Sequence, residues 1–94
     1  MIKSFAGGDS ERVFRGKRAR GLPGSIRKRA LRKLLILNAA EAVREFRVPP
    51  GNRLEKLKGD RAGQYSIRIN DQWRVCFSWR SGNAYEVEIT DYHD

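Results

Sequence analysis

The chain has 94 residues, a formal net charge of +9 and a single cysteine. This length predicts one domain over residues 1–94, and one cysteine excludes an internal disulfide. The longest apolar stretch, residues 34–37, is far too short to cross a bilayer, and the first residues lack the apolar run of a signal peptide. We therefore expect a cytoplasmic protein that has no membrane partner.

The excess of positive charge lies in the first half of the chain. Residues 1–50 contain 13 basic and 4 acidic residues, whereas residues 51–94 contain 7 of each. From Arg12 to Lys33 there are ten basic residues and no acidic one. This asymmetry favours a polyanionic partner, because surfaces that serve only solubility usually mix charges of both signs. A solubilising surface without a partner is the alternative.

The chain is predicted to begin with one short strand followed by helices. We expect the strand at residues 2–6 and a short helix at residues 9–17, capped by Asp9 or Ser10. The sequence GLPG at residues 21–24 then separates this helix from the next one.

The main helix is predicted to begin at a Ser25 cap and to run to about Leu37. One half of its helical wheel is apolar and contains Ile26, Ala30, Leu31, Leu34, Leu35 and Leu37. The other half is basic and contains Lys28, Arg29, Arg32 and Lys33. Arg27 adds a third cation to the first turn, where positive charge opposes the helix dipole, so these cations are expected to serve a partner. Asn38 has the spacing of a capping box for a further short helix through Phe46.

The second half of the chain reads as a β-meander. Strands are expected at residues 53–57, 64–69, 72–79 and 84–93. Alternation assigns one apolar face to Tyr65, Ile67, Ile69, Trp73, Val75, Phe77, Trp79, Tyr85, Val87 and Ile89. The opposite face is polar and contains Arg68, Arg74, Cys76, Ser78, Glu86, Glu88 and Thr90. The apolar face needs a cover, which predicts an α+β fold with N-terminal helices packed on one face of a mainly antiparallel sheet.

The polar face is left free for a ligand, and its register brings basic side chains together. A three-residue loop at residues 70–72 places Arg68 opposite Arg74. If the next loop is residues 80–82, Arg74 faces Glu88, and a cross-strand ion pair is then an alternative role for this arginine.

Metal-dependent and cysteine-dependent chemistry find little support in this sequence. One histidine and one cysteine do not supply an ordinary zinc site, and the acids are too scattered for a magnesium site. Cys76 lies in the middle of a predicted strand without an activating motif, so we interpret it as a packed thiol. We expect neither a metal nor a cofactor.

The chain can instead supply a metal-free site for cleaving a phosphodiester. RNA cleavage without a metal uses the 2′-hydroxyl as nucleophile and needs a base, an acid and fixed cations around the transition state. The candidates for these tasks are Lys58, Arg61, Arg68, Arg74, Tyr92 and His93. Each has a plain alternative: Lys58 is also readable as an ordinary loop lysine, and His93 as part of a frayed terminus.

Together these residues follow the order and spacing of one known family. The chain resembles the HigB-type toxins of the RelE/ParE superfamily, and among them the GraT-like proteins. The resemblance is carried by residues 1–5 (MIKSF), 49–55 (PPGNRLE), 57–63 (LKGDRAG), 65–68 (YSIR), 70–77 (NDQWRVCF) and 91–93 (DYH). It implies a compact RelE/ParE-like domain without a cofactor. It also implies a ribosome-dependent endoribonuclease that cuts mRNA in the ribosomal A site and so inhibits translation.

The resemblance implies partners as well. One is an antitoxin, a HigA-type helix-turn-helix protein that represses the shared operon, so that operator DNA is reached only through the antitoxin. The others are mRNA and the ribosome. The cations expected to contact RNA phosphates are Arg27, Lys28, Arg29, Arg32, Lys33, Arg61 and Arg68.

Residues of the site carry over by position. Lys58 corresponds to a lysine implicated in binding the phosphate or the transition state, and Arg74 to the arginine that faces the scissile phosphate. Tyr92 and His93 correspond to a C-terminal pair implicated in positioning and proton transfer, directly after Asp91.

Glu55 departs from the family pattern, because some HigB toxins have a histidine at this position. The departure leaves open whether Glu55 acts as the base, whether His93 does more of the proton transfer, or whether the enzyme is weak.

Two other functions stay open on the sequence. A ParE-like toxin that inhibits gyrase would share the fold and lack nuclease chemistry, and the combination of Lys58, Arg74 and the Tyr92-His93 terminus argues against it. A non-catalytic nucleic-acid-binding module would use exposed aromatic residues for base stacking, whereas the aromatic residues here alternate onto the predicted core face.

Overall fold

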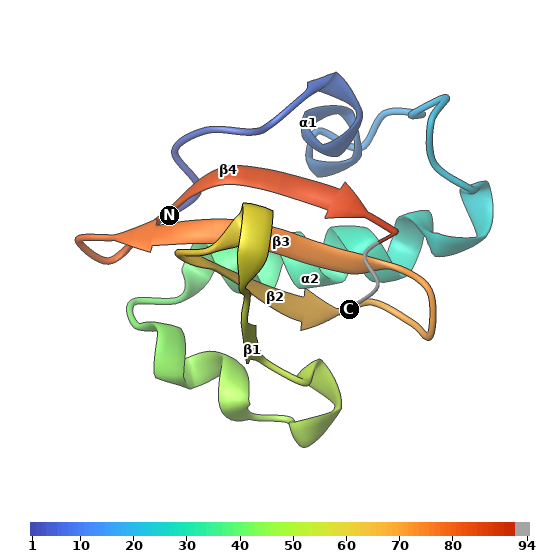
Figure 1. Cartoon of the computed structure of the whole chain (residues 1–94). Helices are drawn as coiled ribbons and strands as arrows, with labels where there is room; N and C mark the ends of the chain where they lie inside the picture. The colour runs from blue at the N-terminus through green and yellow to red at the C-terminus, as the bar shows by residue number, and fades with distance from the viewer. Residues whose placement is uncertain (92–94) are drawn as a thin grey trace.

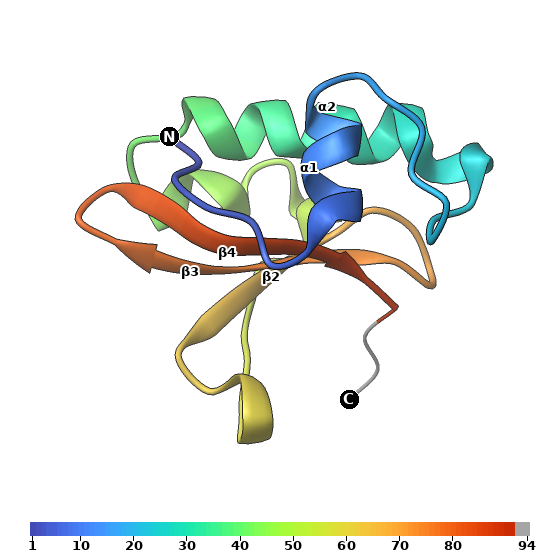
Figure 2. The same cartoon turned by 90° about the horizontal axis from the view of Figure 1, so that it is seen from above.

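The computed structural model describes residues 1–91, which form two layers (Figure 1). Two α-helices cover one face of a four-stranded sheet, and Figure 2 shows both on the same side of it. The predicted α+β class is confirmed. The α-helices are α1 (Gly8–Phe14) and α2 (Arg27–Ala39), and the 3-10 helices are η1 (Gly24–Ile26), η2 (Val43–Arg47), η3 (Pro50–Asn52) and η4 (Gly59–Arg61). The strands are β1 (Glu55–Lys56), β2 (Gln64–Arg68), β3 (Arg74–Arg80) and β4 (Asn83–Thr90).

The sheet is an antiparallel meander in the order β1-β2-β3-β4. Strands β2 and β3 pair in the predicted register, with Arg68 opposite Arg74. The β3–β4 turn is shorter than predicted: it consists of residues 81–82, both with positive φ (50° and 78°), which suits a tight two-residue hairpin. The alternative role considered for Arg74, a cross-strand ion pair with Glu88, does not apply, because Thr90 lies opposite Arg74.

A bulge in β4 shifts this register further. Ser78 pairs with Tyr85, and Cys76 pairs with Glu88. The step between these two pairs is two residues along β3 but three residues along β4, so β4 contains one extra residue. Glu86 lies in the bulge with a φ of 54°. Tyr85 therefore lies on the face of Ser78, which corrects its predicted place on the apolar face. The guanidinium carbon of Arg80 lies 4.1 Å from the centre of the Tyr85 ring.

The N-terminal segment runs along the edge of β4 without forming a regular strand. Ile2 and Phe5 form isolated parallel bridges to Ala84 and Val87. The Lys3 N–H donates a 2.8 Å hydrogen bond to the carbonyl oxygen of Ala84. The strand predicted at residues 2–6 is thus replaced by an extended segment with single bridges.

Helix α1 is shorter than predicted and has no side-chain cap. The predicted caps, Asp9 and Ser10, both lie inside the helix, which begins at Gly8 and ends at Phe14. Ser10 is buried, and its Oγ accepts a 2.8 Å hydrogen bond from the Ile89 N–H of β4. The hydroxyl that was predicted to begin the helix instead joins the helix to the sheet.

Helix α2 begins after a 3-10 turn, and the predicted Ser25 cap makes no capping hydrogen bond. The helix buries Ala30, Leu34 and Leu37 against the sheet. Leu35 is 52% exposed, so its expected place on the core side is wrong. It lies at the margin of the apolar half of the wheel, beyond the reach of the sheet.

The capping box predicted at Asn38 does not form. Asn38 lies within α2, where its Oδ1 accepts a 2.9 Å hydrogen bond from the Ile2 N–H. The following short helix is η2, a 3-10 helix that begins only at Val43. The Glu45 carboxylate accepts two hydrogen bonds of 2.9 Å from the backbone N–H groups just before this helix. These N–H groups at the start of the helix therefore have an acceptor.

The core fills the space between the helices and the apolar face of the sheet. Its buried members are Val13, Ile26, Ala30, Leu34, Leu37, Ala40, Phe46, Ile67, Ile69, Val75, Phe77, Ala84, Val87 and Ile89. Phe46 packs edge-on against Phe77, with ring centres 5.6 Å apart. Trp73 and Trp79 pack against this core, so their predicted place on the apolar face is confirmed. In the described residues, no helix has the length and apolarity needed to span a membrane.

Candidate active site

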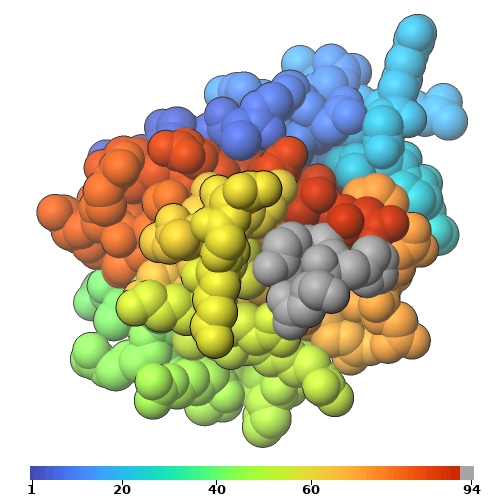
Figure 3. Space-filling view, viewed as in Figure 1, coloured from blue at the N-terminus to red at the C-terminus, as the bar shows by residue number. Residues whose placement is uncertain are grey.

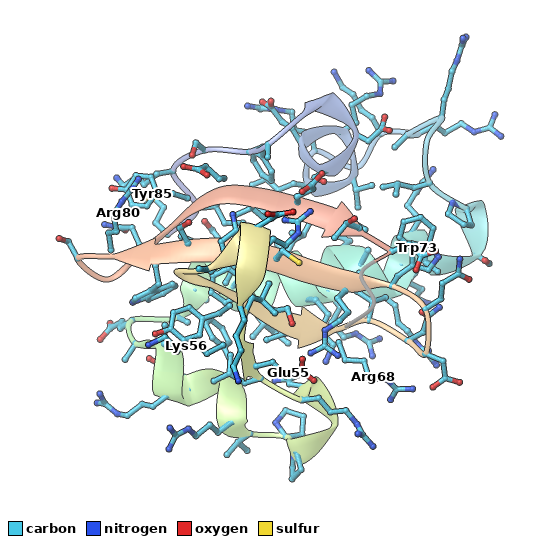
Figure 4. All side chains as sticks on the ribbon, viewed as in Figure 1. Glu55, Lys56, Arg68, Trp73, Arg80 and Tyr85 are labelled. Atoms are coloured by element: carbon cyan, nitrogen blue, oxygen red, sulfur yellow. The ribbon has the colours of Figure 1, made fainter. Side chains whose placement is uncertain are left out.

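A polar groove of about 310 Å³ lies at the end of the sheet where β2 turns into β3. It is lined by Arg53, Glu55, Arg68, Asn70, Asp71 and Arg74. Glu55 and Arg68 are labelled in Figure 4 and lie beside one another at this end of the sheet, on β1 and β2. Three guanidinium groups thus face two carboxylates, which leaves the groove positively charged.

Arg74 is the most firmly held side chain of the groove. Its Nε donates a 2.8 Å hydrogen bond to Ser66 Oγ, and its Nη2 donates a 2.5 Å bond to the carbonyl oxygen of Arg53. The side chain is only 12% exposed. The guanidinium is fixed by neighbouring groups of the protein and still borders the open groove.

Glu55 and Arg68 complete the charged wall. A carboxylate oxygen of Glu55 lies 3.8 Å from Arg74 Nη2, so the acid that departs from the family pattern contacts the central arginine. Arg68 forms an ion pair with Asp71, which is almost fully exposed. An ion pair at so exposed a position contributes little to stability, so Arg68 is available for an anionic ligand.

The structure does not bring every predicted site residue into this groove. Lys58 is exposed and follows β1, at the start of η4, and it is not among the lining residues. Figure 2 shows its segment, in yellow, projecting from the sheet on the side away from the helices, and Figure 3 shows the same yellow segment near the middle of that face. Asp91 follows β4, and its Oδ2 accepts a 3.0 Å hydrogen bond from Gln72 Nε2. Tyr92 and His93 lie outside the described residues.

Four of the five helix cations predicted to contact RNA are exposed along α2: Arg27, Lys28, Arg29 and Arg32. Lys33 differs, because it is partly buried and its Nζ donates a hydrogen bond to Asn52 Oδ1. Burial, and then the positive charges of Arg32, Arg29 and Arg68, lower the pKa of Lys33. Lys33 therefore connects the basic face of α2 with the arginines of the groove.

Arg61 is engaged within the protein. Its guanidinium forms a 2.9 Å ion pair with Glu88 and a 3.1 Å hydrogen bond with Gln64 Oε1. The Glu88 carboxylate, considered above as an alternative partner of Arg74, pairs with Arg61. This pairing offsets part of the charge with which Arg61 was predicted to contact RNA.

Sequence reasoning missed the residues that fix the site and identified the thiol correctly. Cys76 is buried, and burial raises the pKa of its thiol, so the prediction of a packed thiol is confirmed. Ser66 is fully buried and supplies the acceptor for Arg74. Its position two residues before Arg68 on the same strand face was the available signal. The roles of Asn52 and Arg53 depend on loop geometry that no periodicity encodes.

Within residues 1–91, no three His, Cys, Asp or Glu side chains gather in a group that could hold a metal ion.

Comparison with known proteins places this chain in a family. The family model of the RelE-like toxin HigB, of type II toxin–antitoxin systems, matches residues 3–93. The chain belongs to this family of HigB-like toxins. This toxin is 50% identical over 73 residues to Toxin HigB-1 of Vibrio cholerae serotype O1. The matched region covers 78% of this chain and 77% of that protein. It is 33% identical over 97 residues to Endoribonuclease HigB of Proteus vulgaris, covering 99% of this chain and 100% of that one.

The structural comparison agrees at the level of the fold. A chain of the YoeB–YefM complex from Staphylococcus aureus superposes with a TM-score of 0.54 at 16% identity, over 100% of this chain and 99% of that chain. The predicted RelE/ParE-like fold is thus confirmed. The family match and the full-length relative confirm the predicted class, a type II toxin with endoribonuclease activity. As a type II toxin, this protein has an antitoxin partner.

Proposed function

We propose that this toxin cleaves mRNA on the ribosome, with the scissile phosphate bound in the polar groove and the RNA 2′-hydroxyl as nucleophile. The observation that supports this most directly is the fixed guanidinium of Arg74 beside Ser66 Oγ and the Arg53 carbonyl. A cation held in place before the substrate arrives stabilises the charge that develops on the phosphate without reorganising. Arg68, which borders the same groove, adds a second cation to it.

The proton transfers need a base and an acid. We assign the base role to Glu55 or His93, with Tyr92 and Asp91 helping to position the substrate, and we assign phosphate binding to Lys58. Among the three of these residues that the structure describes, Glu55 lines the groove whereas Lys58 and Asp91 do not, and its contact with Arg74 keeps its carboxylate directed there. A carboxylate in this position can accept the 2′-hydroxyl proton, provided that the RNA brings that hydroxyl within hydrogen-bond reach.

The proposal extends to the partners of the toxin, which are the ribosome and the antitoxin. Residues 1–94 act as one catalytic unit in the cytoplasm, and the exposed cations of α2 bind ribosomal RNA through phosphate contacts. The antitoxin is a HigA-type helix-turn-helix protein that carries the toxin to operator DNA.

The test is cleavage of mRNA on programmed ribosomes, with the cut ends mapped. We expect a site-specific cut that requires ribosomes and that Arg74→Ala slows by about 100-fold or more, the usual effect of removing a donor that stabilises the transition state. His93→Gln is expected to slow the cut as well. Arg80→Ala is the matched control, because Arg80 ends the same strand but lies on Tyr85 at the far end of the sheet. We expect it to stay within about threefold of wild type.

An intact message in the presence of a wild-type protein that still arrests growth would contradict the proposal. DNA gyrase would then be the next target to examine.

A further inference from the structure

A second, larger cavity lies on the helical side of the molecule, apart from the polar groove. Its volume is about 530 Å³, within the usual range for small-molecule and nucleotide sites. It is lined by Arg12, Val13, Arg18, Ala19, Arg20, Leu22, Pro23, Gly24, Ile26, Arg27 and Ala30. None of these residues lines the polar groove.

The cavity has an apolar floor and a basic rim. Val13, Ile26 and Ala30 are buried, and they form the floor where α1 packs against α2. The rim carries Arg12, Arg18, Arg20 and Arg27, all of them exposed. This combination suits a ligand that joins a flat apolar group to an anion.

Among the described residues, the rim arginines form no ion pair with an acidic side chain. Within residues 1–91, no ion pair involves any of these four arginines, although Arg15, Arg61, Arg68 and Arg74 all pair with carboxylates. No acidic residue lines the cavity. Four like charges around one concavity repel one another, and an anion bound there would relieve that repulsion.

The loop that forms the rim is held in place by the protein itself. Arg12 Nε donates a 2.6 Å hydrogen bond to the carbonyl oxygen of Arg18, which ties residues 15–20 to α1. Gly21 lies so close to Asp9 that a Cβ at this position would be 2.1 Å from the carboxylate. The rim is therefore built before any ligand binds.

We propose that this cavity binds one unpaired nucleotide of ribosomal RNA, with the base on the apolar floor and its phosphate on the rim arginines. A guanidinium group donates two parallel hydrogen bonds to phosphate oxygens and can also stack on a base. The rim arginines can therefore contact both the phosphate and the base of one nucleotide. Arg27 belongs to the rim, at the first position of α2, and is followed directly by Lys28 and Arg29 of the basic face, so the cavity adjoins the surface proposed to contact ribosomal RNA. The inference rests on the proposed function and adds a specific docking point to it.

The experiment measures binding of the purified toxin to mRNA-free bacterial ribosomes by co-sedimentation at several salt concentrations. Arg18→Gln with Arg20→Gln is expected to raise the dissociation constant about tenfold or more and to reduce the salt dependence, because phosphate contacts are lost. Ala19→Trp places a bulky side chain in the cavity and removes no charge, and we expect it to weaken binding by a similar factor. Arg15→Gln with Lys17→Gln is the control, since it removes two cations of the same segment that lie outside the cavity, and we expect a change below about threefold. Thermal unfolding of each variant checks that it is folded.

Two results would overturn the inference. The first is that the Ala19→Trp variant and the Arg18→Gln, Arg20→Gln variant both bind ribosomes as tightly as the control variant does. The other is weaker binding of the antitoxin by these variants with ribosome binding unchanged, which would assign the cavity to a peptide segment. Cleavage by the wild-type toxin is measured alongside: tight ribosome binding without cleavage would reject the proposed function and leave the cavity assignment standing.

Discussion

The groove shows at the residue scale how a buried hydroxyl can control a charged side chain. Ser66 is fully buried, and its Oγ is the acceptor for Arg74 Nε. Without this acceptor the Nε–H group would lose its partner in a position where water is largely excluded, which costs about 1–3 kcal/mol. The guanidinium would then be free to leave the orientation in which it faces the groove.

We therefore predict that Ser66→Ala slows cleavage on saturating ribosomes by about tenfold, with little effect on ribosome affinity, because a misplaced donor loses transition-state stabilisation and not ground-state binding. Single-turnover cleavage rates measure the effect. Ser78→Ala, on the neighbouring strand, is the control that should leave the rate nearly unchanged. If Ser66→Ala caused the same slowing in an Arg74→Ala background, Ser66 would not act through Arg74.

At the scale of elements, alternation and helical periodicity predicted most of the fold. The alternation of β2 and β3 placed Ile67, Val75 and Phe77 in the core and put Arg68 opposite Arg74. The prediction failed in β4, because a bulge at Glu86 adds one residue that no alternation pattern announces. That extra residue moved Tyr85 to the polar face.

The predicted helix caps were also wrong at this scale. A serine near a helix start has several possible partners, and the sequence does not tell which it takes. Ser10 bonds to the backbone of β4, whereas Ser25 makes no capping bond.

The two serines give a matched prediction for stability. Ser10→Ala removes the acceptor of the Ile89 N–H and should lower the free energy of unfolding by about 1–3 kcal/mol. Ser25→Ala, at an exposed position without such a bond, should change it by less than about 0.5 kcal/mol. Urea unfolding curves of both variants measure these values. Equal values for the two variants would show that the Ser10 bond does not hold α1 on the sheet.

At the scale of the whole molecule, the distribution of charge is unfavourable for folding at one helix terminus. Three cations occupy the start of α2, where the helix dipole is unfavourable to them, and no acidic residue lies in this first turn. The groove and the basic face of α2 meet at Lys33, which contacts Asn52 and experiences the charge of Arg68. A long RNA could therefore contact both surfaces.

This arrangement predicts opposite effects of one substitution on stability and binding. Lys28→Glu should raise the free energy of unfolding by about 0.3–1 kcal/mol, because it places a negative charge at the helix N-terminus. The same change should weaken ribosome binding, because a phosphate contact is replaced by repulsion. Lys3→Glu, with the same change of charge in the N-terminal segment, should give neither the stabilisation nor the loss of binding. Thermal unfolding and ribosome co-sedimentation measure both quantities, and a Lys28→Glu variant that binds like wild type would count against an RNA-binding role for α2.

The candidate site could be predicted only in part, for physical reasons. Arg68 and Arg74 were identified because they fall on strands whose register the sequence encodes, whereas Glu55 was identified only through the family resemblance. The pairing of Arg61 with Glu88 was not predicted, because it joins a 3-10 turn to a strand 27 residues away. The contact between Lys33 and Asn52 likewise depends on how η3 packs against α2, which only the folded chain determines.

The most direct test of the account uses a ribosome-bound message with a single 2′-deoxynucleotide at the cleaved position. We predict that wild-type toxin cuts the unmodified message and leaves a 2′,3′-cyclic phosphate, and that the 2′-deoxy message stays intact although it binds the ribosome normally. The expected result follows because the groove supplies cations and a carboxylate while the RNA supplies the nucleophile. Cleavage of the 2′-deoxy message at a similar rate would show that the nucleophile comes from elsewhere and would contradict the proposed mechanism.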